Sequence, residues 1–169
     1  MTMGDRIAVL ADGILQQVDS PRNLYNHPDN IFVGGFIGSP AMNFFNGTLV
    51  GEEGNLYVDT GDFRVKIADD RKGSAADYDG KEVVLGMRPE HIHAPQYAPQ
   101  NIDPSPINGV VELVELLGAE LHLHVSSGKN TFIATVDPRM DVHAGNEVEL
   151  VTDMSAAHLF DKESERAIR

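Results

Sequence analysis

GVVELVELLGAELHLHVSSGKNTFIATV, residues 109–136, alternates apolar with polar side chains in short runs. The runs cover 109–117, 121–125 and 132–136, and the small polar residues 126–130 separate the last two as a turn. Successive side chains of a β-strand point to opposite faces, so this pattern predicts strands with one face in a core and the other toward water. In Leu121–Val125 the two histidines take the water-facing positions. The stretch therefore predicts a β fold.

The same texture begins near Asn43 and continues to the C-terminal part of the chain. Short alternating runs separated by turn residues are typical of an all-β barrel or sandwich. Two segments interrupt the pattern: Asp69–Asp79 is charged and small and predicts a surface excursion, and Pro95–Pro106 holds four prolines and predicts a connector that divides the β region into two lobes. The further strands expected are Phe44–Val50, Leu56–Asp59, Phe63–Ile67, Glu82–Met87 and Val148–Val151.

The first 40 residues predict a hairpin and two short helices. Asp12–Gly13 supplies the residues that a tight hairpin turn needs between two β-type runs. Ser20 is an N-cap, Pro28 ends the first helix before it, and Gly38–Pro40 ends the second. The expected elements are a hairpin of Arg6–Leu10 with Ile14–Val18, a helix opened by Ser20-Pro21 that stops near Asn26, and a helix from Asn30.

Composition excludes several classes of function. The chain of 169 residues has no cysteine, so disulfides, thiolate catalysis and cysteine-bound zinc are ruled out. Its net charge of −13 repels phosphate backbones, and we expect no nucleic-acid partner. Met1–Leu10 lacks a signal-peptide pattern, and Ile31–Gly38, the longest weakly polar run, is too short to span a bilayer. We therefore expect no direct membrane insertion.

Two His-x-His pairs raise the question of a metal site. His122 and His124 share one strand face, and His91 and His93 repeat the spacing, which suits a single metal ion. No Asp or Glu lies between Val125 and Thr131 to complete a ligand set. We therefore favour an exposed barrel strand and expect no metal ligand.

Catalytic residues are not expected either. The sequence offers Glu112, Glu115 and Glu120 as candidates for the paired carboxylates of a glycosidase. No tryptophan accompanies them as a sugar platform, and outward strand charges explain them better. No serine or threonine lies in a nucleophile elbow. We expect neither a catalytic nor a cofactor-binding residue in this chain.

Arg88-Pro89-Glu90-His91 is the most specific local signal. Pro89 forces Arg88 into an extended conformation, so that the guanidinium and the Glu90 carboxylate project from one tight corner. One interpretation is an anchor for the corner of the barrel, and the other is direct contact with an effector or a second subunit. We favour the anchor.

Three stretches resemble the C-terminal part of ATPase subunits from sugar-importer ABC transporters, the maltose-transporter ATPase family. They are the hairpin and helix runs within residues 1–40, the sequence Gly86-Met87-Arg88-Pro89-Glu90-His91, and the closing His158–Asp161. The resemblance implies a mainly β protein, with an OB-type β-barrel regulatory domain, also called TOBE, after a short α/β remnant. Residues 1–40 would be the C-terminal remnant of the nucleotide-binding domain and residues 41–169 the regulatory domain. Gly86, Arg88, Pro89, Glu90 and His91 would be its motif and interface residues.

The chain lacks the glycine-rich phosphate loop and the magnesium-binding carboxylate of an ATPase, so we expect no enzymatic activity from it. ATP and magnesium would belong to the full-length parent. The resemblance then implies a regulatory and dimerisation domain of a carbohydrate importer of the sugar, polyol or glycerol-phosphate type. Its implied partners are a second copy in a homodimer, the membrane permease subunits and a regulatory protein. Its implied location is the cytoplasm, at the inner face of the plasma membrane.

The alternative is a barrel that senses a small ligand, such as an oxyanion or another effector, in a cleft between barrels. A basic or amide-rich cleft would favour this alternative. Outside Arg88, Lys81, Lys129 and Arg139 the sequence offers few cations for it, so we favour the regulatory and dimerisation domain.

Overall fold

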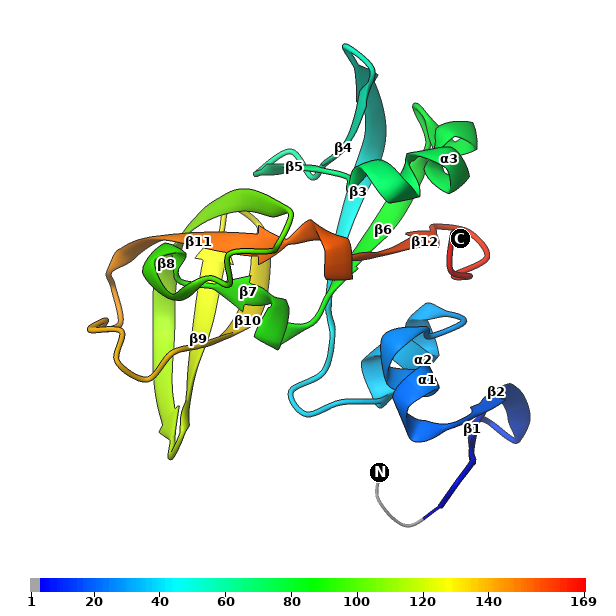
Figure 1. The fold of residues 1–169 in the computed structure, drawn as a ribbon, viewed down its shortest axis with the longest axis horizontal. Helices are drawn as coiled ribbons and strands as arrows, with labels where there is room; N and C mark the ends of the chain where they lie inside the picture. Colours follow the sequence, from blue (N-terminus) through cyan, green and yellow to red (C-terminus); the bar gives the residue numbers. More distant parts are fainter. Residues whose placement is uncertain (1–3) are drawn as a thin grey trace.

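The structure is a computed structural model that describes residues 4–169 (Figure 1). Strands dominate, and the helices are short, as expected of a mainly β protein. The elements are β1 (Ile7–Ala11), β2 (Ile14–Asp19), α1 (Pro21–Asn26), α2 (Ile31–Phe36), β3 (Asn43–Glu52), β4 (Asn55–Asp59), β5 (Arg64–Lys66), η1 (Asp69–Arg71), α3 (Lys72–Ala75), η2 (Ala76–Tyr78), β6 (Glu82–Met87), η3 (Pro89–His91), β7 (Ile92–His93), η4 (Pro95–Tyr97), β8 (Pro104–Leu117), β9 (Glu120–Ser127), β10 (Asn130–Val136), β11 (Glu147–Asp153), η5 (Met154–Ala156) and β12 (His158–Asp161).

The N-terminal segment folds as predicted. β1 and β2 pair in antiparallel fashion, and Asp12 and Gly13 take the positive φ angles, 49° and 80°, that the turn between them requires. The Ser20 side chain accepts a hydrogen bond from the Asn23 backbone N–H and caps α1. The Asn30 side chain caps α2 in the same way.

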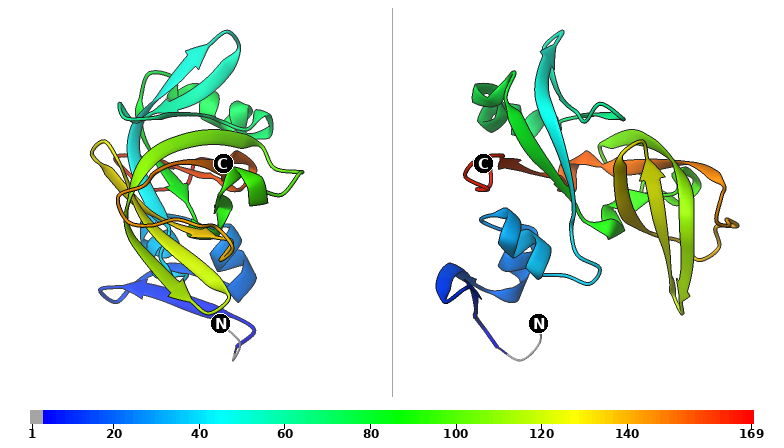
Figure 2. Two further views of the ribbon diagram at one scale, coloured as in Figure 1. Left: turned by 90° about the vertical axis from the view of Figure 1, so that its left-hand side faces the viewer. Right: turned by 180° about the vertical axis from the view of Figure 1, so that it is seen from behind.

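Two antiparallel five-stranded sheets form the rest of the molecule (Figures 1 and 2). The first sheet has the order β12-β6-β3-β4-β5, and the second has the order β10-β9-β8-β11-β7. The last strand, β12, thus returns to the first sheet after the chain has built the second. β12 is thus an edge strand, and the first sheet contains residues from both ends of the β region.

The two sheets share one apolar core. Phe45 of β3 is 1% exposed, and its ring lies edge-to-face against Phe63 at 5.1 Å and against Phe132 of β10 at 5.7 Å between centroids. Beside it, the Asn43 side chain exchanges two hydrogen bonds, of 2.8 and 2.9 Å, with the backbone of Ile133. The sheets are therefore joined by packing and by hydrogen bonds.

The predicted division of the β region at Pro95–Pro106 is wrong. β7 precedes this segment and β8 follows it, yet both belong to the second sheet, so the chain passes between sheets near Arg88. The segment also ends early, because β8 begins at Pro104. Pro104 and Pro106 pair only with β11, since β9 joins β8 from Val110 onward, and a proline without a donor is tolerated beside an open strand edge.

The predicted surface excursion at Asp69–Asp79 is in fact mostly helical. It forms η1, α3 and η2, and Ala75 lies in the shared core. Arg71 at the end of η1 is half-buried. The charged composition therefore gave no indication that one side of this segment packs against the core.

Candidate functional site

Arg88 joins the helices to the sheets. It ends β6 with an extended backbone, φ −74° and ψ 145°, as expected before Pro89, and its side chain is only 1% exposed. Nε and Nη2 donate to the Tyr25 carbonyl at 3.2 and 2.6 Å, and Nη1 donates to the Ile37 carbonyl at 2.7 Å. The guanidinium carbon lies 3.6 Å from the centre of the Tyr25 ring. One buried cation thus contacts residues at the ends of α1 and α2.

The carbonyls that Arg88 binds belong to helix C-termini. The last carbonyls of a helix have no partner within it and carry partial negative charge. Tyr25 is in the last turn of α1, and Ile37 is the C-cap of α2. A guanidinium presents several donors in a rigid plane and can bind both acceptors at once, which a lysine ammonium matches poorly.

Glu90 and Tyr25 form a second contact across the same junction. The Tyr25 hydroxyl donates to Glu90 Oε1, and burial together with this carboxylate raises the pKa of Tyr25 to about 12. The backbone N–H of His91 donates to the Arg88 carbonyl at 3.0 Å and closes the η3 turn. The turn therefore holds Arg88 and Glu90 toward the same helix.

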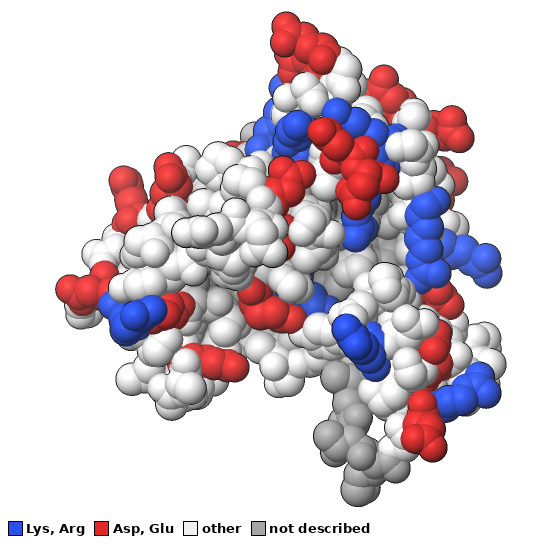
Figure 3. All heavy atoms as spheres, viewed as in Figure 1, with Lys and Arg blue, Asp and Glu red and all other residues white. Residues whose placement is uncertain are grey.

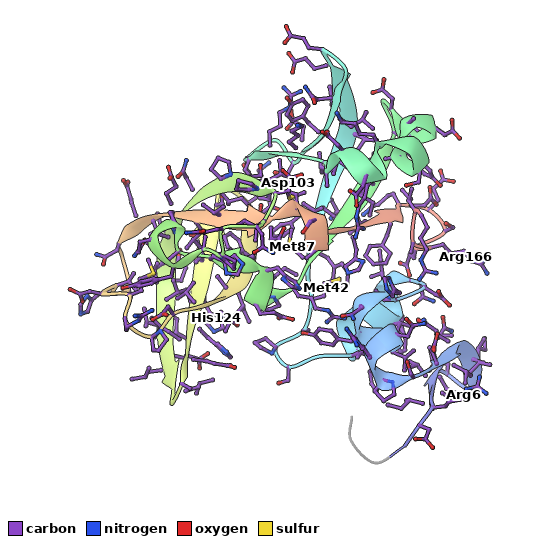
Figure 4. All side chains as sticks on the ribbon, in the orientation of Figure 1. Arg6, Met42, Met87, Asp103, His124 and Arg166 are labelled. Atoms are coloured by element: carbon purple, nitrogen blue, oxygen red, sulfur yellow. The ribbon has the colours of Figure 1, made fainter. Side chains whose placement is uncertain are left out.

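Two glycines let these elements approach closely. A Cβ on Gly86 would lie 2.6 Å from Met42 Sδ and 2.8 Å from the Phe160 ring. Gly38 has a φ of +127°, and a Cβ there would lie 2.8 Å from Arg88 Nη1. Figure 4 labels Met42 where the chain runs from the helices to β3. A larger residue at Gly86 would collide with Met42 and Phe160, and one at Gly38 would collide with the Arg88 side chain.

The C-terminal residues form a third link to the helices. The backbone of Ile31 donates to the Glu165 carbonyl at 3.0 Å, and the backbone of Ala167 donates to Asp29 at 2.9 Å. Arg169 pairs with the Asp29 carboxylate at 2.9 Å. Figures 1 and 2 both place this end of the chain beside α1 and α2. The helices are thus held from two sides, by β6 and by the turn after β12.

The other candidate residues do not converge on a catalytic site. His122 is 7% exposed and lies 3.2 Å from Glu120, so the prediction that it faces water is wrong. His124, labelled in Figure 4, is 2.8 Å from Glu115. Glu112 is exposed and accepts a hydrogen bond from Ser126 at 2.6 Å. Within residues 4–169 no group of three or more metal-ligating side chains comes together.

Sequence reasoning missed a cluster of arginines and histidines beside Arg88. The half-buried His158 of β12 has a pKa lowered to about 3, first because burial disfavours its charged form and then because Arg71, Arg88, His27 and His91 are near. These residues are far apart in the sequence and share no motif. Only the return of β12 to the first sheet brings them together.

Replacing His158 by glutamine is expected to flatten the acid side of the stability profile. The unfolded chain protonates this imidazole near 6.5, whereas the folded chain does so near 3, so the free energy of unfolding of the native protein falls as pH drops through this window. His158 contributes up to about 1.4 kcal/mol per pH unit to the slope of the free energy of unfolding against pH. Urea denaturation between pH 7 and 4.5, in a buffer without phosphate, measures this slope. The exposed His143→Gln change is the control, and equal slopes in both variants and the native protein would contradict the expectation.

The fold and the junction define a β protein of two half-barrel sheets with an N-terminal helical segment held against them. The chain matches the MalK OB fold domain family over residues 38–92 and the TOBE domain family over residues 85–160. The two matches overlap at the turn that carries Arg88. In a solved structure, the cytoplasmic molybdate-binding protein ModG with molybdate bound, 94% of the chain aligns with 69% of this one at a TM-score of 0.50 and 17% identity, which supports the fold alone.

Curated relatives match from one end of the chain to the other. The osmoprotective compounds uptake ATP-binding protein GgtA of Synechocystis is 46% identical over 99% of the chain. The oligosaccharides import ATP-binding protein MsmX of Bacillus subtilis is 39% identical over 100%, and the trehalose/maltose import ATP-binding protein MalK of Thermococcus litoralis is 43% identical over 99%. The chain covers 46%, 46% and 45% of these proteins respectively, or about half their length.

The chain therefore belongs to the ATP-binding proteins of sugar-type ABC importers and carries their C-terminal MalK OB fold and TOBE domains. The residues that the two family models match, 38–160, are regulatory domains. In the described part of the chain no helix is long and apolar enough to cross a membrane.

Proposed function

We propose that this chain is the regulatory and dimerisation part of the ATP-binding subunit of a carbohydrate importer, for a sugar, a polyol or a glycerol phosphate. Residues 1–40 are the end of the nucleotide-binding domain, and residues 41–169 are the regulatory domain. The names of GgtA, MsmX and MalK, which concern osmoprotective compounds, oligosaccharides and trehalose or maltose, support import of polar carbohydrates and related solutes. ATP and magnesium act in the full-length parent.

The observation that carries this proposal is the Arg88 junction. A regulatory domain must transmit a shift of its own position to the ATPase, and transmission requires a stiff contact between them. Arg88, directly after β6, binds carbonyls at the C-terminal ends of both helices in residues 1–40 and is itself buried. Movement of β6 would therefore move α1 and α2 with it. Gly86, Arg88, Pro89, Glu90 and His91 form this contact in our proposal.

The proposed partners are a second copy of the chain, the permease subunits reached through the full-length ATPase, and a regulatory protein that acts on the β domains. This arrangement places the protein in the cytoplasm at the inner face of the plasma membrane. Within the chain, the β1–β2 hairpin presents the exposed side chains of Leu10, Ile14 and Leu15. Exposed apolar side chains on a two-stranded sheet favour association with another surface. We propose that this hairpin takes part in a two-fold homodimer, which closes and does not polymerise.

Replacing Leu15 by lysine is expected to convert this homodimer to a monomer, because the charge would be buried in the apolar contact. Light scattering after size exclusion measures the mass. Leu116→Lys is the matched control on the β8–β9 hairpin, since Leu15 is 58% exposed and Leu116 is 65% exposed. A dimer lost only in the Leu116 variant would place the interface on the β domain, and a monomeric native chain would contradict the homodimer.

A further inference from the structure

Two adjoining cavities lie where α1, η1 and β12 meet, with volumes of about 290 and 230 Å³. They share His27, Arg71 and His158 as lining residues. Arg88 and His91 complete the first cavity on the side of β6, and the second extends to Arg169. Both volumes lie below the range typical of drug-sized ligands, so the space suits a small ion or one end of a compact metabolite.

Arginines and histidines gather in the lining of these cavities, in a protein that is otherwise acidic. Three of the 13 lysines and arginines and three of the seven histidines line these two cavities, although the net charge of the whole chain is −13. Asp70 is the one side-chain carboxylate among the lining residues that the structure describes. Figure 3 shows acidic side chains in several separate groups on the visible face, with basic ones among them and beside the C-terminal segment. A cavity of one sign concentrates ions of the opposite sign.

The cations differ in what they can offer to a ligand. Arg88 is buried and engaged with the helix carbonyls, so it supplies positive potential and not direct bonds. Arg71 is half-buried, and within residues 4–169 its one side-chain hydrogen bond runs from Nη2 to the Ser155 carbonyl at 3.2 Å. Its Nε and Nη1 donors remain available, and a guanidinium binds oxyanions through pairs of such donors. Ser74 also lines the second cavity, and its hydroxyl donates to the Arg71 carbonyl at 3.2 Å.

We propose that these cavities bind a phosphate group, carried either by inorganic phosphate or by a phosphate monoester. Arg71 is the direct ligand of the phosphate. The histidines that line the cavities and Arg169 surround the phosphate, and the buried Arg88 contributes positive potential without a direct bond. The site is formed by the helical segment, η1 and β12, and so differs from the cleft between barrels in which an oxyanion would be expected from the sequence. A bound phosphate would bridge α1 and β12 and thereby stabilise the contact between residues 1–40 and the β domain.

Isothermal titration calorimetry of the whole chain with inorganic phosphate tests the proposal, at constant ionic strength because salt screens exposed charges. We expect saturable binding in the native chain. Arg71→Gln is expected to weaken it by about tenfold or more, since one hydrogen bond to a charged group is worth about 1.5–3 kcal/mol. Arg139→Gln removes the same charge from an exposed arginine that pairs with Asp137, and it should bind as the native chain does.

Absence of saturable binding in the native chain, or equal weakening by the Arg71 and Arg139 changes, overturns the proposal. Circular dichroism checks that each variant is folded, and Arg169→Gln, at the rim, provides a second variant with a smaller expected loss. Titration with glycerol 3-phosphate then identifies the source: tighter binding than inorganic phosphate assigns the site to phosphate monoesters, and equal or weaker binding assigns it to the free ion.

Discussion

Replacing Arg88 by alanine is expected to lower the free energy of unfolding by about 3–5 kcal/mol. The change leaves the buried carbonyls of Tyr25 and Ile37 without their donors, removes the cation from the face of the Tyr25 ring and opens a cavity. Each orphaned acceptor costs about 1–3 kcal/mol. Urea denaturation followed by circular dichroism measures the loss. Hydrogen exchange should also show that the substitution raises the exchange rates of the amides in α1 and α2 more than those of the amides in the sheets.

Three further variants test whether hydrogen bonding causes this effect. Arg88→Met keeps much of the volume and removes the donors, so it should be nearly as destabilising as alanine. Arg88→Lys keeps the charge at a single nitrogen and should recover only part of the stability. Arg139→Ala changes an exposed arginine paired with Asp137 and should cost less than about 1 kcal/mol. An Arg88→Ala protein within 1 kcal/mol of the native one would contradict the role of this junction.

Replacing Phe45 by alanine is the second change with a large expected effect, about 3–5 kcal/mol of destabilisation. The Phe45 ring packs against Phe63 and against Phe132, so its removal leaves a cavity between the two sheets. Because the core is shared, both sheets should unfold together in a single transition at a lower urea concentration. Denaturation followed by near-ultraviolet circular dichroism and by tyrosine fluorescence measures the midpoints.

Phe36→Ala is the matched control, because Phe36 is 65% exposed and its ring stacks only on Phe32 among the aromatic residues described. It should change the stability by less than about 1 kcal/mol. Two separate transitions in the native chain would refute a shared core, even if Phe45→Ala were destabilising. A small effect of Phe45→Ala would show that the sheets repack around the missing ring.

The junction explains how two small structural units can act as one. Residues 1–40 have their own apolar cluster, built around Leu24 and Val33, and it is separate from the shared core of the sheets. Between these clusters lie the Arg88 hydrogen bonds, the contacts of Met42 and the backbone pairing with Ala167. Hydrogen bonds and a small apolar contact hold a defined geometry between the two clusters. In our proposal, the junction is therefore the place where movement of one unit is passed to the other.

Much of the secondary structure could be predicted because its causes are local. The β1–β2 turn follows from Asp12–Gly13, and the starts of α1 and α2 follow from the caps Ser20 and Asn30. The short apolar run Val83–Met87 after Glu82 placed β6 with its observed bounds. In contrast, β7 and β12 have two and four residues, too few for a periodic pattern. Their pairing is decided by the strands beside them.

The sequence alone determined the family resemblance, the mainly β class and the choice of Arg88 as a residue of interest, since these depend on order and spacing along the chain. Only the tertiary structure decided what Arg88 binds, because its partners are the backbone carbonyls of Tyr25 and Ile37, which no residue type announces. The same holds for the basic cavity around Arg71 and His158. Its arginines and histidines come from distant parts of the chain and meet because β12 pairs with β6 at the edge of the first sheet.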